Sequence, residues 1–117
     1  MKDDRVYLLH VLDAANRVSE YTREGRDYFF ADRKTQDAVI RNLEVIGEAT
    51  KGLSDPLRAA YPQVPWKQIA GMRDTLIHRY FGVNLDLVWE VVEKHLPEYK
   101  AKVEAILADL PGQIGPP

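Results

Sequence analysis

The chain has 117 residues, of which 45% are hydrophobic and 29% charged, and its formal net charge is −2. This balance favours a soluble globular protein of one domain and argues against a disordered chain or a general nucleic-acid coat protein, which is usually basic. The absence of cysteine excludes disulfides and thiol chemistry, and the lack of a membrane-spanning apolar run or a signal peptide favours the cytoplasm.

Apolar residues recur at helical spacing along the first half of the chain, without an alternating strand pattern. The first predicted helix covers about residues 4–22, and Gly25 ends its pattern before a short aromatic run. The second covers about residues 35–51 and stops at Gly52. A third, short helix over about residues 55–60 follows a capping serine and carries an early proline.

The second half of the chain has the same helical character. Two prolines predict an extended connection to a fourth helix over about residues 65–80, which Gly82 ends. Asn84 can cap a fifth helix over about residues 85–96. A sixth helix, over about residues 97–110, begins with a proline, which suits a first turn.

The predicted fold class is therefore all-α, an antiparallel helical bundle of about five to six helices. We expect one bundle domain over residues 1–110 and a disordered C-terminal tail over residues 111–117. If one face of the bundle stays apolar, two copies can pair as a symmetric dimer.

The fourth predicted helix carries side chains suited to phosphate chemistry. At about 100° per residue, Arg73 and Tyr80 nearly eclipse one another, whereas Arg73 and His78 stand roughly 140° apart. Asp74 and His78 form an i, i+4 pair in which the carboxylate can orient the imidazole. A second copy of the helix across a two-fold axis would bring Arg and His side chains into one cleft. Spacing alone does not distinguish this group from an ordinary surface helix with solvated charges.

The segment Arg73-Asp74-Thr75-Leu76-Ile77-His78 resembles the HEPN ribonuclease signature, an Arg, a polar residue, a short spacer and a His. Its extension to Tyr80 resembles the Arg-x4-His-x-Tyr form of HepT-like toxins. Further blocks of resemblance lie at residues 41–49, 61–66, 69–72, 83–89 and 96–97. The chain is thus similar to HepT-like toxins of the HEPN superfamily over about residues 41–97, without a departure from the motif.

This resemblance implies a HEPN-like homodimeric bundle with a composite RNA-cleaving cleft. It implies a metal-independent endoribonuclease toxin of a toxin–antitoxin system, with no cofactor. It also implies a cognate partner, a minimal nucleotidyltransferase antitoxin that transfers AMP to the motif tyrosine. Carried over to this chain, the catalytic residues are Arg73, His78 and Asp74, and the AMP acceptor is Tyr80.

These residue types fit a reaction in which the RNA 2′-hydroxyl attacks the adjacent phosphorus. His78 can transfer protons near neutral pH, and a place near a helix C-terminus favours its protonated form. Arg73 can stabilise the negatively charged phosphorane with two hydrogen bonds. Asp74 would orient the imidazole. AMP on Tyr80 would add bulk and negative charge where RNA phosphates bind, and so block the cleft.

Other polar residues have weaker assignments. Three cations are candidate RNA contacts, although scattered surface cations are common: Arg41, Lys67 and Arg79. Glu48 fits a structural hydrogen bond better than catalysis. His10 and His95 lie on separate predicted helices without matching carboxylates, so we expect no metal site.

The sequence leaves two other classes of function open. The chain could be a non-catalytic binding or regulatory subunit of a two-component nucleotidyltransferase. Its slightly acidic composition fits that role slightly better than it fits RNA binding. It could also be a purely structural helical dimer, but that leaves the motif unexplained. The complete set of Arg73, Asp74, His78 and Tyr80 favours the ribonuclease.

Overall fold

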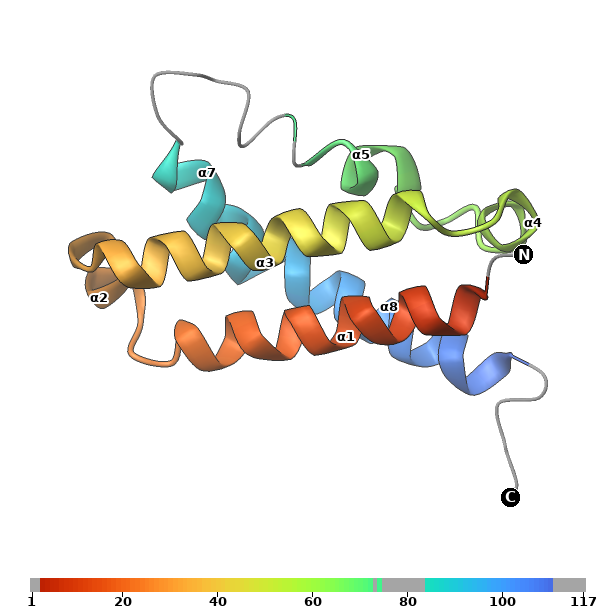
Figure 1. Cartoon of the computed structure of the whole chain (residues 1–117), viewed down its shortest axis with the longest axis horizontal. Helices are drawn as coiled ribbons and strands as arrows, with labels where there is room; N and C mark the ends of the chain where they lie inside the picture. The colour runs from red at the N-terminus through yellow and green to blue at the C-terminus, as the bar shows by residue number, and fades with distance from the viewer. Residues whose placement is uncertain (1–2, 73, 75–83, 111–117) are drawn as a thin grey trace.

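The computed structural model describes residues 3–72, 74 and 84–110, and every regular element in these ranges is helical (Figure 1). The first half comprises α1 (Asp4–Tyr21), α2 (Arg26–Ala31), α3 (Arg33–Lys51) and α4 (Asp55–Ala60). The second half comprises α5 (Trp66–Ala70), α7 (Leu85–Glu90), the π-helical turn η1 (Val91–His95) and α8 (Leu96–Asp109). The predicted all-α fold is confirmed. Within the described ranges, no helix is both long enough and apolar enough to span a membrane.

The two longest helices, α1 and α3, lie side by side and antiparallel, with α2 at the turn between them (Figure 1). α8 packs against α1, and α5 packs against α3. The fully buried side chains of the core cluster include Leu8, Val11, Phe29, Val39, Leu43, Ile46, Leu53, Val88 and Val103. They come from both halves of the chain, so burial of their apolar surface holds the two halves together.

Asp32 moves the start of α3 two residues ahead of the boundary predicted at Thr35. Its carboxylate accepts hydrogen bonds from the Thr35 N–H at 3.0 Å and the Thr35 hydroxyl at 2.6 Å. These bonds satisfy an amide group that the first helical turn leaves without an intrahelical partner. The same bonds, the hydroxyl first, hold the pKa of Asp32 below its ordinary value. The predicted stop of α3 at Gly52 is confirmed.

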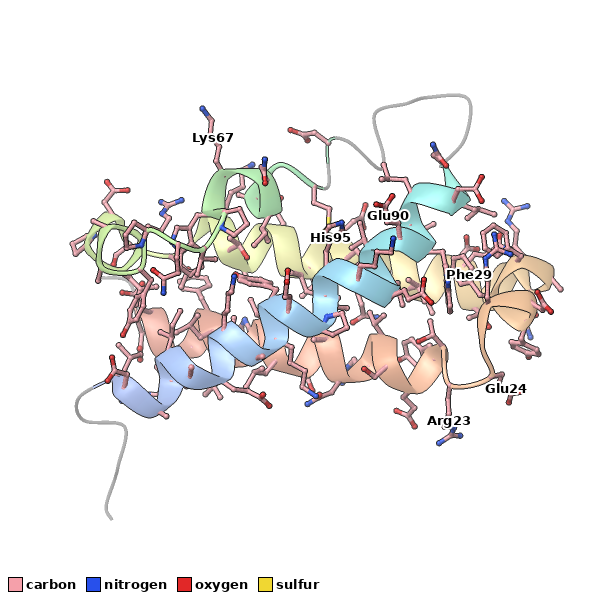
Figure 2. The ribbon with its side chains drawn as sticks, turned by 180° about the vertical axis from the view of Figure 1, so that it is seen from behind. Arg23, Glu24, Phe29, Lys67, Glu90 and His95 are labelled. Atoms are coloured by element: carbon pink, nitrogen blue, oxygen red, sulfur yellow. The ribbon has the colours of Figure 1, made fainter. Side chains whose placement is uncertain are left out.

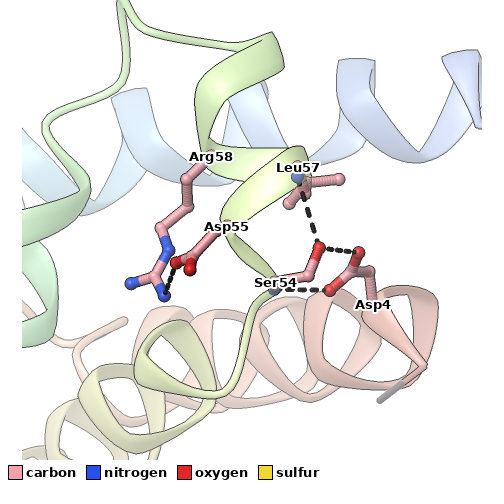
Figure 3. Close-up of polar contacts among 5 residues, drawn as sticks. All are labelled: Asp4, Ser54, Asp55, Leu57 and Arg58. Carbon is pink, nitrogen blue, oxygen red and sulfur yellow. Dashed lines mark hydrogen bonds and ion pairs between the residues drawn. The ribbon is translucent and has the colours of Figure 1, made fainter. Parts of the chain in front are cut away.

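Ser54 caps α4, as predicted, and also ties it to the start of α1 (Figure 3). The two carboxylate oxygens of Asp4 accept the Ser54 N–H at 2.8 Å and the Ser54 hydroxyl at 2.7 Å. The Ser54 oxygen in turn accepts the Leu57 N–H at 3.2 Å. One serine therefore completes a helix cap and joins two helices whose residues lie 50 positions apart in the sequence.

The predicted separation between helices over about residues 85–96 and 97–110 is wrong, because α7, η1 and α8 follow one another without a break. Near the predicted boundary, the N–H of Leu96 donates to the carbonyl of Val91, five residues back. Pro97 has no N–H, and its ring crowds the carbonyl four residues earlier. A widened π turn relieves this crowding without ending the helix.

The predicted continuous helix over about residues 65–80 is wrong at Gly71. α5 ends at Ala70, and Gly71 caps it by donating its N–H to the Lys67 carbonyl at 3.0 Å. Glycine costs about 1 kcal/mol relative to alanine inside a helix, so a helix is readily interrupted there. Met72 and Asp74 are again helical. The rest of that prediction, with its stop at Gly82 and the tail at 111–117, lies outside the described residues.

Candidate functional site

The structure places one member of the predicted catalytic group. Asp74 is helical and exposed, three residues after Gly71. Arg73, His78 and Tyr80 lie outside the described residues. Their approach to Asp74, and the shared cleft, therefore stay predictions.

Trp66 anchors α5, the helix that leads into the motif. The Trp66 side chain is buried, and its indole N–H donates to the Tyr61 carbonyl at 3.0 Å. Its ring meets the ring of Tyr99 on α8 edge-on, with centroids 6.1 Å apart. The Tyr99 hydroxyl hydrogen bonds with the fully buried hydroxyl of Thr50 on α3 at 2.8 Å. These contacts join the start of α5, the helix that precedes the motif, to α8 and α3.

The Tyr99 phenol is held in its neutral form. Burial raises its pKa to about 12, and the hydrogen bond with Thr50 acts in the opposite direction with smaller effect. Burial favours the neutral phenol because a phenolate would lose its hydration. Tyr99 is therefore a fixed, uncharged part of the wall behind α5.

α7 receives the chain after the motif and is also fixed to the bundle. Asn84 caps it as predicted, since its side-chain oxygen accepts the Leu87 N–H at 3.1 Å. Val88 is fully buried, and the Trp89 ring lies 5.3 Å from the ring of Phe29 on α2. Both flanks of residues 73–83 are thus anchored on one helical core.

Two of the three predicted RNA-contact cations are described, and they lie on different helices. Arg41, exposed on α3, forms an ion pair with Glu44 at 3.6 Å. Lys67 is exposed on α5 and projects away from the bundle (Figure 2). Arg79 lies outside the described residues.

Arg41 lines a broad groove of about 500 Å³ between α1 and α3. Lys51, His10 and Tyr7 line the same groove, so cationic and aromatic groups gather there. Glu48, for which sequence reasoning favours a structural role, is exposed and lines this groove as well. Lys67 is not among the lining residues, so the structure does not bring it together with Arg41.

A smaller cavity of about 230 Å³, the α5–η1 pocket, lies between α5 and the rod formed by η1 and α8. Its lining residues are Pro65, Gln68, Ile69, Met72, Val91, His95, Glu98, Tyr99 and Lys102. His95, which lies 3.8 Å from Glu90, is seen on this rod in Figure 2. Met72 is the residue before Arg73, so the pocket adjoins the start of the motif.

Sequence reasoning missed the α5–η1 pocket for an identifiable reason. His95, Glu98, Tyr99 and Lys102 have the i, i+3, i+4, i+7 spacing of one helix face. The face becomes visible only if the helix runs through Pro97. A predicted boundary at that proline divided it between two elements.

No three His, Cys, Asp or Glu side chains in residues 3–72, 74 and 84–110 lie close enough together to hold a metal ion. His10, on α1, instead meets the Tyr7 ring edge-on, with centroids 6.4 Å apart. What the described residues offer next to the motif is an apolar pocket with polar side chains among its lining residues.

A helical bundle that anchors both flanks of an Arg-x4-His-x-Tyr segment has the architecture expected of a HEPN-like nuclease. The family model described as "Ribonuclease HepT-like" matches residues 11–106. The chain therefore belongs to the HepT-like ribonuclease family.

Similar proteins agree with this membership. "Probable ribonuclease HepT" of Thermococcus cleftensis is 43% identical over 101 residues, which is 86% of this chain and 92% of that protein. "Putative RNase MJ0127" of Methanocaldococcus jannaschii is 43% identical over 113 residues, 96% of this chain and 93% of that protein. These relationships and the family match identify the chain as a ribonuclease.

A longer relative from Methanocaldococcus jannaschii is named "Gamma-glutamylcyclotransferase and putative RNase MJ0434". It is 46% identical over 110 residues, 93% of this chain, and this chain spans 50% of its length. No solved structure shows a significant match to the chain.

Proposed function

We propose that this ribonuclease is a metal-independent endoribonuclease toxin whose catalytic residues are Arg73, His78 and Asp74. The observation that carries the proposal is the family match over residues 11–106, which includes the whole Arg-x4-His-x-Tyr segment. The anchored helices α5 and α7 support it, because a reactive segment needs fixed flanks to hold its side chains in register.

In the proposed reaction, the 2′-oxygen of the RNA forms a bond to the adjacent phosphorus, and the bond from phosphorus to the 5′-oxygen breaks. One general base removes the 2′-proton, and one general acid protonates the leaving 5′-oxygen. His78 serves in these proton transfers, with Asp74 orienting its ring. Arg73 stabilises the charge that develops on the phosphorane oxygens. The products are a 2′,3′-cyclic phosphate and a 5′-hydroxyl, and no metal ion takes part.

The proposal includes a symmetric homodimer. Roughly 140° separates Arg73 from His78 on one ideal helix, so a single copy does not present both on one face. A two-fold axis beside this helix supplies a second pair of the same side chains and completes the cleft. Sedimentation velocity at micromolar concentration should show the dimer, and a monomer would contradict this part of the proposal.

The proposed partner is a minimal nucleotidyltransferase that acts as antitoxin. The Tyr80 hydroxyl attacks the α-phosphorus of ATP, pyrophosphate leaves, and the tyrosine proton is lost to solvent. The attached AMP adds bulk and a negative phosphodiester to the RNA cleft. The support is the position of Tyr80, seven residues after Arg73 in the motif.

Expression of the chain alone, and together with its nucleotidyltransferase, tests the proposal in cells. Growth should stop with the wild type alone and recover on coexpression, while Arg73→Ala and His78→Ala should be harmless yet folded by circular dichroism. Arg23→Ala, an exposed arginine between α1 and α2, is the matched control and should remain toxic (Figure 2). Undiminished toxicity of either motif variant counts against the proposal. A harmless wild type that only alters nucleotidyltransferase activity would favour the regulatory-subunit alternative.

Intact-mass analysis after coexpression tests the acceptor. The wild type should gain AMP, and Tyr80→Phe should not. AMP attached to another residue in the wild type would remove the assignment of Tyr80 and leave the ribonuclease proposal standing.

A further inference from the structure

We propose that the α5–η1 pocket accepts one unstacked base of the RNA substrate, next to the phosphate that is cleaved. This inference rests on the proposed function and adds to it a class of substrate, single-stranded RNA with a base turned out of its stack. Recognition of single-stranded RNA commonly buries such a base against apolar or aromatic side chains and reads its edge by hydrogen bonds.

The chemistry of the pocket suits a base. Ile69, Met72 and Val91 are partly buried and supply apolar walls, whereas Gln68 and Glu98 are exposed and supply polar groups. A glutamine amide can pair with adenine through a donor and an acceptor, and a carboxylate accepts from the amino group of cytosine. The pocket therefore favours bases that carry an exocyclic amino group.

The back of the pocket is rigid. Tyr99 is held from two sides, by the hydrogen bond of its hydroxyl to Thr50 at 2.8 Å and by the edge of Trp66. A preformed wall reduces the ordering that a flexible oligonucleotide must otherwise impose on the protein. The π turn at Val91–His95 continues directly into α8, so one continuous rod supplies the wall that faces α5.

The position of the pocket ties it to the cleavage motif. Met72 lines it and is bonded directly to Arg73, and consecutive Cα atoms lie about 3.8 Å apart. A nucleotide whose base contacts Met72 therefore lies beside the start of the motif, to which the proposed function assigns the cleaved phosphate. Lys102, on the opposite wall, adds a cation for a neighbouring phosphate.

A second copy of the chain is a poor occupant of this cavity. A stable protein interface buries roughly 800 Å² on each partner, spread over an extended surface. A cavity of about 230 Å³ instead receives one compact group. We therefore assign the pocket to a base and not to the dimer contact.

Methyl NMR offers a direct test, since the chain contains only two methionines and Met72 lies in the pocket. The probes are 2′-O-methyl tetranucleotides of adenine and of uracil, and an abasic tetranucleotide with the same number of phosphates. The 2′-O-methyl group removes the attacking hydroxyl, so binding is measured without cleavage. The Met72 methyl signal should shift to saturation with the adenine oligonucleotide, more weakly with uracil, and not with the abasic one.

Paired variants locate the contact. Gln68→Ala and Glu98→Ala should weaken binding of the adenine oligonucleotide by about fivefold or more, as expected for the loss of a base-edge contact. Gln63→Ala and Glu104→Ala change the same residue types at exposed positions outside the pocket and should bind like the wild type. Equal affinity of all five proteins would overturn the assignment of Gln68 and Glu98.

Three results would overturn the pocket proposal itself. The first is an equal Met72 shift with the abasic oligonucleotide, and the second is no shift with any probe. The third is a shift that follows protein concentration without oligonucleotide, because it would place a second copy in the pocket. Failure of the ribonuclease proposal looks different: RNA cleavage would survive His78→Ala, whatever the Met72 signal does.

Discussion

At the scale of single residues, the hydrogen bonds of Ser54 lead to a prediction about stability. Ser54→Ala removes the acceptor for the Leu57 N–H and the donor to Asp4, so a helix cap and an interhelical bond are lost together. We expect the free energy of unfolding to fall by about 0.5–2 kcal/mol, the range for a lost N-cap. Urea unfolding of the two proteins measures the difference.

Ser19→Ala is the matched control. Ser19 is exposed within α1 and caps no helix. Because alanine has the higher helix propensity, this change should leave the free energy of unfolding unchanged or raise it slightly. If both serine variants behaved alike, the role given to the Ser54 bonds would be wrong.

The raised pKa of Tyr99 predicts that the protein loses stability in alkali. This pKa rises from 10.0 in the unfolded chain to about 12 in the fold, so the unfolded chain releases this proton first. The contribution is fully present below pH 10 and is lost as the pH rises through 12. The double variant Tyr99→Phe/Thr50→Val removes both hydroxyls of the buried bond and should flatten this part of the profile.

Urea unfolding between about pH 8 and pH 12 would measure how the free energy of unfolding changes with pH. This interval runs from below the pKa of 10.0 in the unfolded chain up to the pKa of about 12 in the fold. The control is Tyr28→Phe, which removes an exposed phenol and should keep the wild-type slope. A double variant with the wild-type slope would show that the alkaline loss has another origin.

Which residue contacts could be predicted depends on their distance along the chain. The caps at Ser54 and Asn84 and the stop at Gly52 were predictable, because each acts on amides or carbonyls a few residues away. The bond between Thr50 and Tyr99 was not, since its partners lie 49 positions apart and meet only when α3 and α8 pack.

At the scale of elements, the π turn at Val91–His95 leads to a prediction about the effect of deleting one residue. Deleting Lys94, an exposed residue of η1, should convert the widened turn to ordinary α-helix without rotating α8 about its axis. With Pro97 retained, the proline ring then crowds the preceding turn, and we expect a loss of about 3 kcal/mol. With Pro97→Ala, the same deletion should cost much less. Thermal unfolding of the four proteins of this cycle tests the account.

Deletion of Ala101 is the control for this cycle. That residue is exposed in α8, and its loss turns every later position by about 100°. Val103 and Ile106 would leave the core in either proline background. If the Lys94 deletion cost the same with and without Pro97, the proline would not be the cause of the π turn.

Among elements, periodicity predicted α1, α3 and α4 closely, because their apolar stripes are long or their caps are marked. It fails where one residue type fits two local structures. The sequence predicts a helix start at Pro97, whereas the helix continues through Pro97 after a π turn. The sequence also predicts an unbroken helix through Gly71, whereas Gly71 caps α5.

At the scale of the whole molecule, the bundle followed from amphipathic helices that must bury their apolar faces against one another. The enzyme class followed from the resemblance of residues 73–80 and neighbouring blocks, not from geometry, since helical spacing fits a surface helix equally well. The α5–η1 pocket could not be predicted, because it forms between segments that meet only after folding.

The central claim is metal-independent cleavage by Arg73 and His78, and assay of the purified chain on single-stranded RNA tests it most directly. In excess EDTA, the wild type should produce fragments ending in 2′,3′-cyclic phosphates. His78→Ala, with unchanged circular dichroism, should cleave about 10²- to 10⁴-fold more slowly. Cleavage that stops on addition of EDTA, or that persists at the wild-type rate in His78→Ala, would contradict the account.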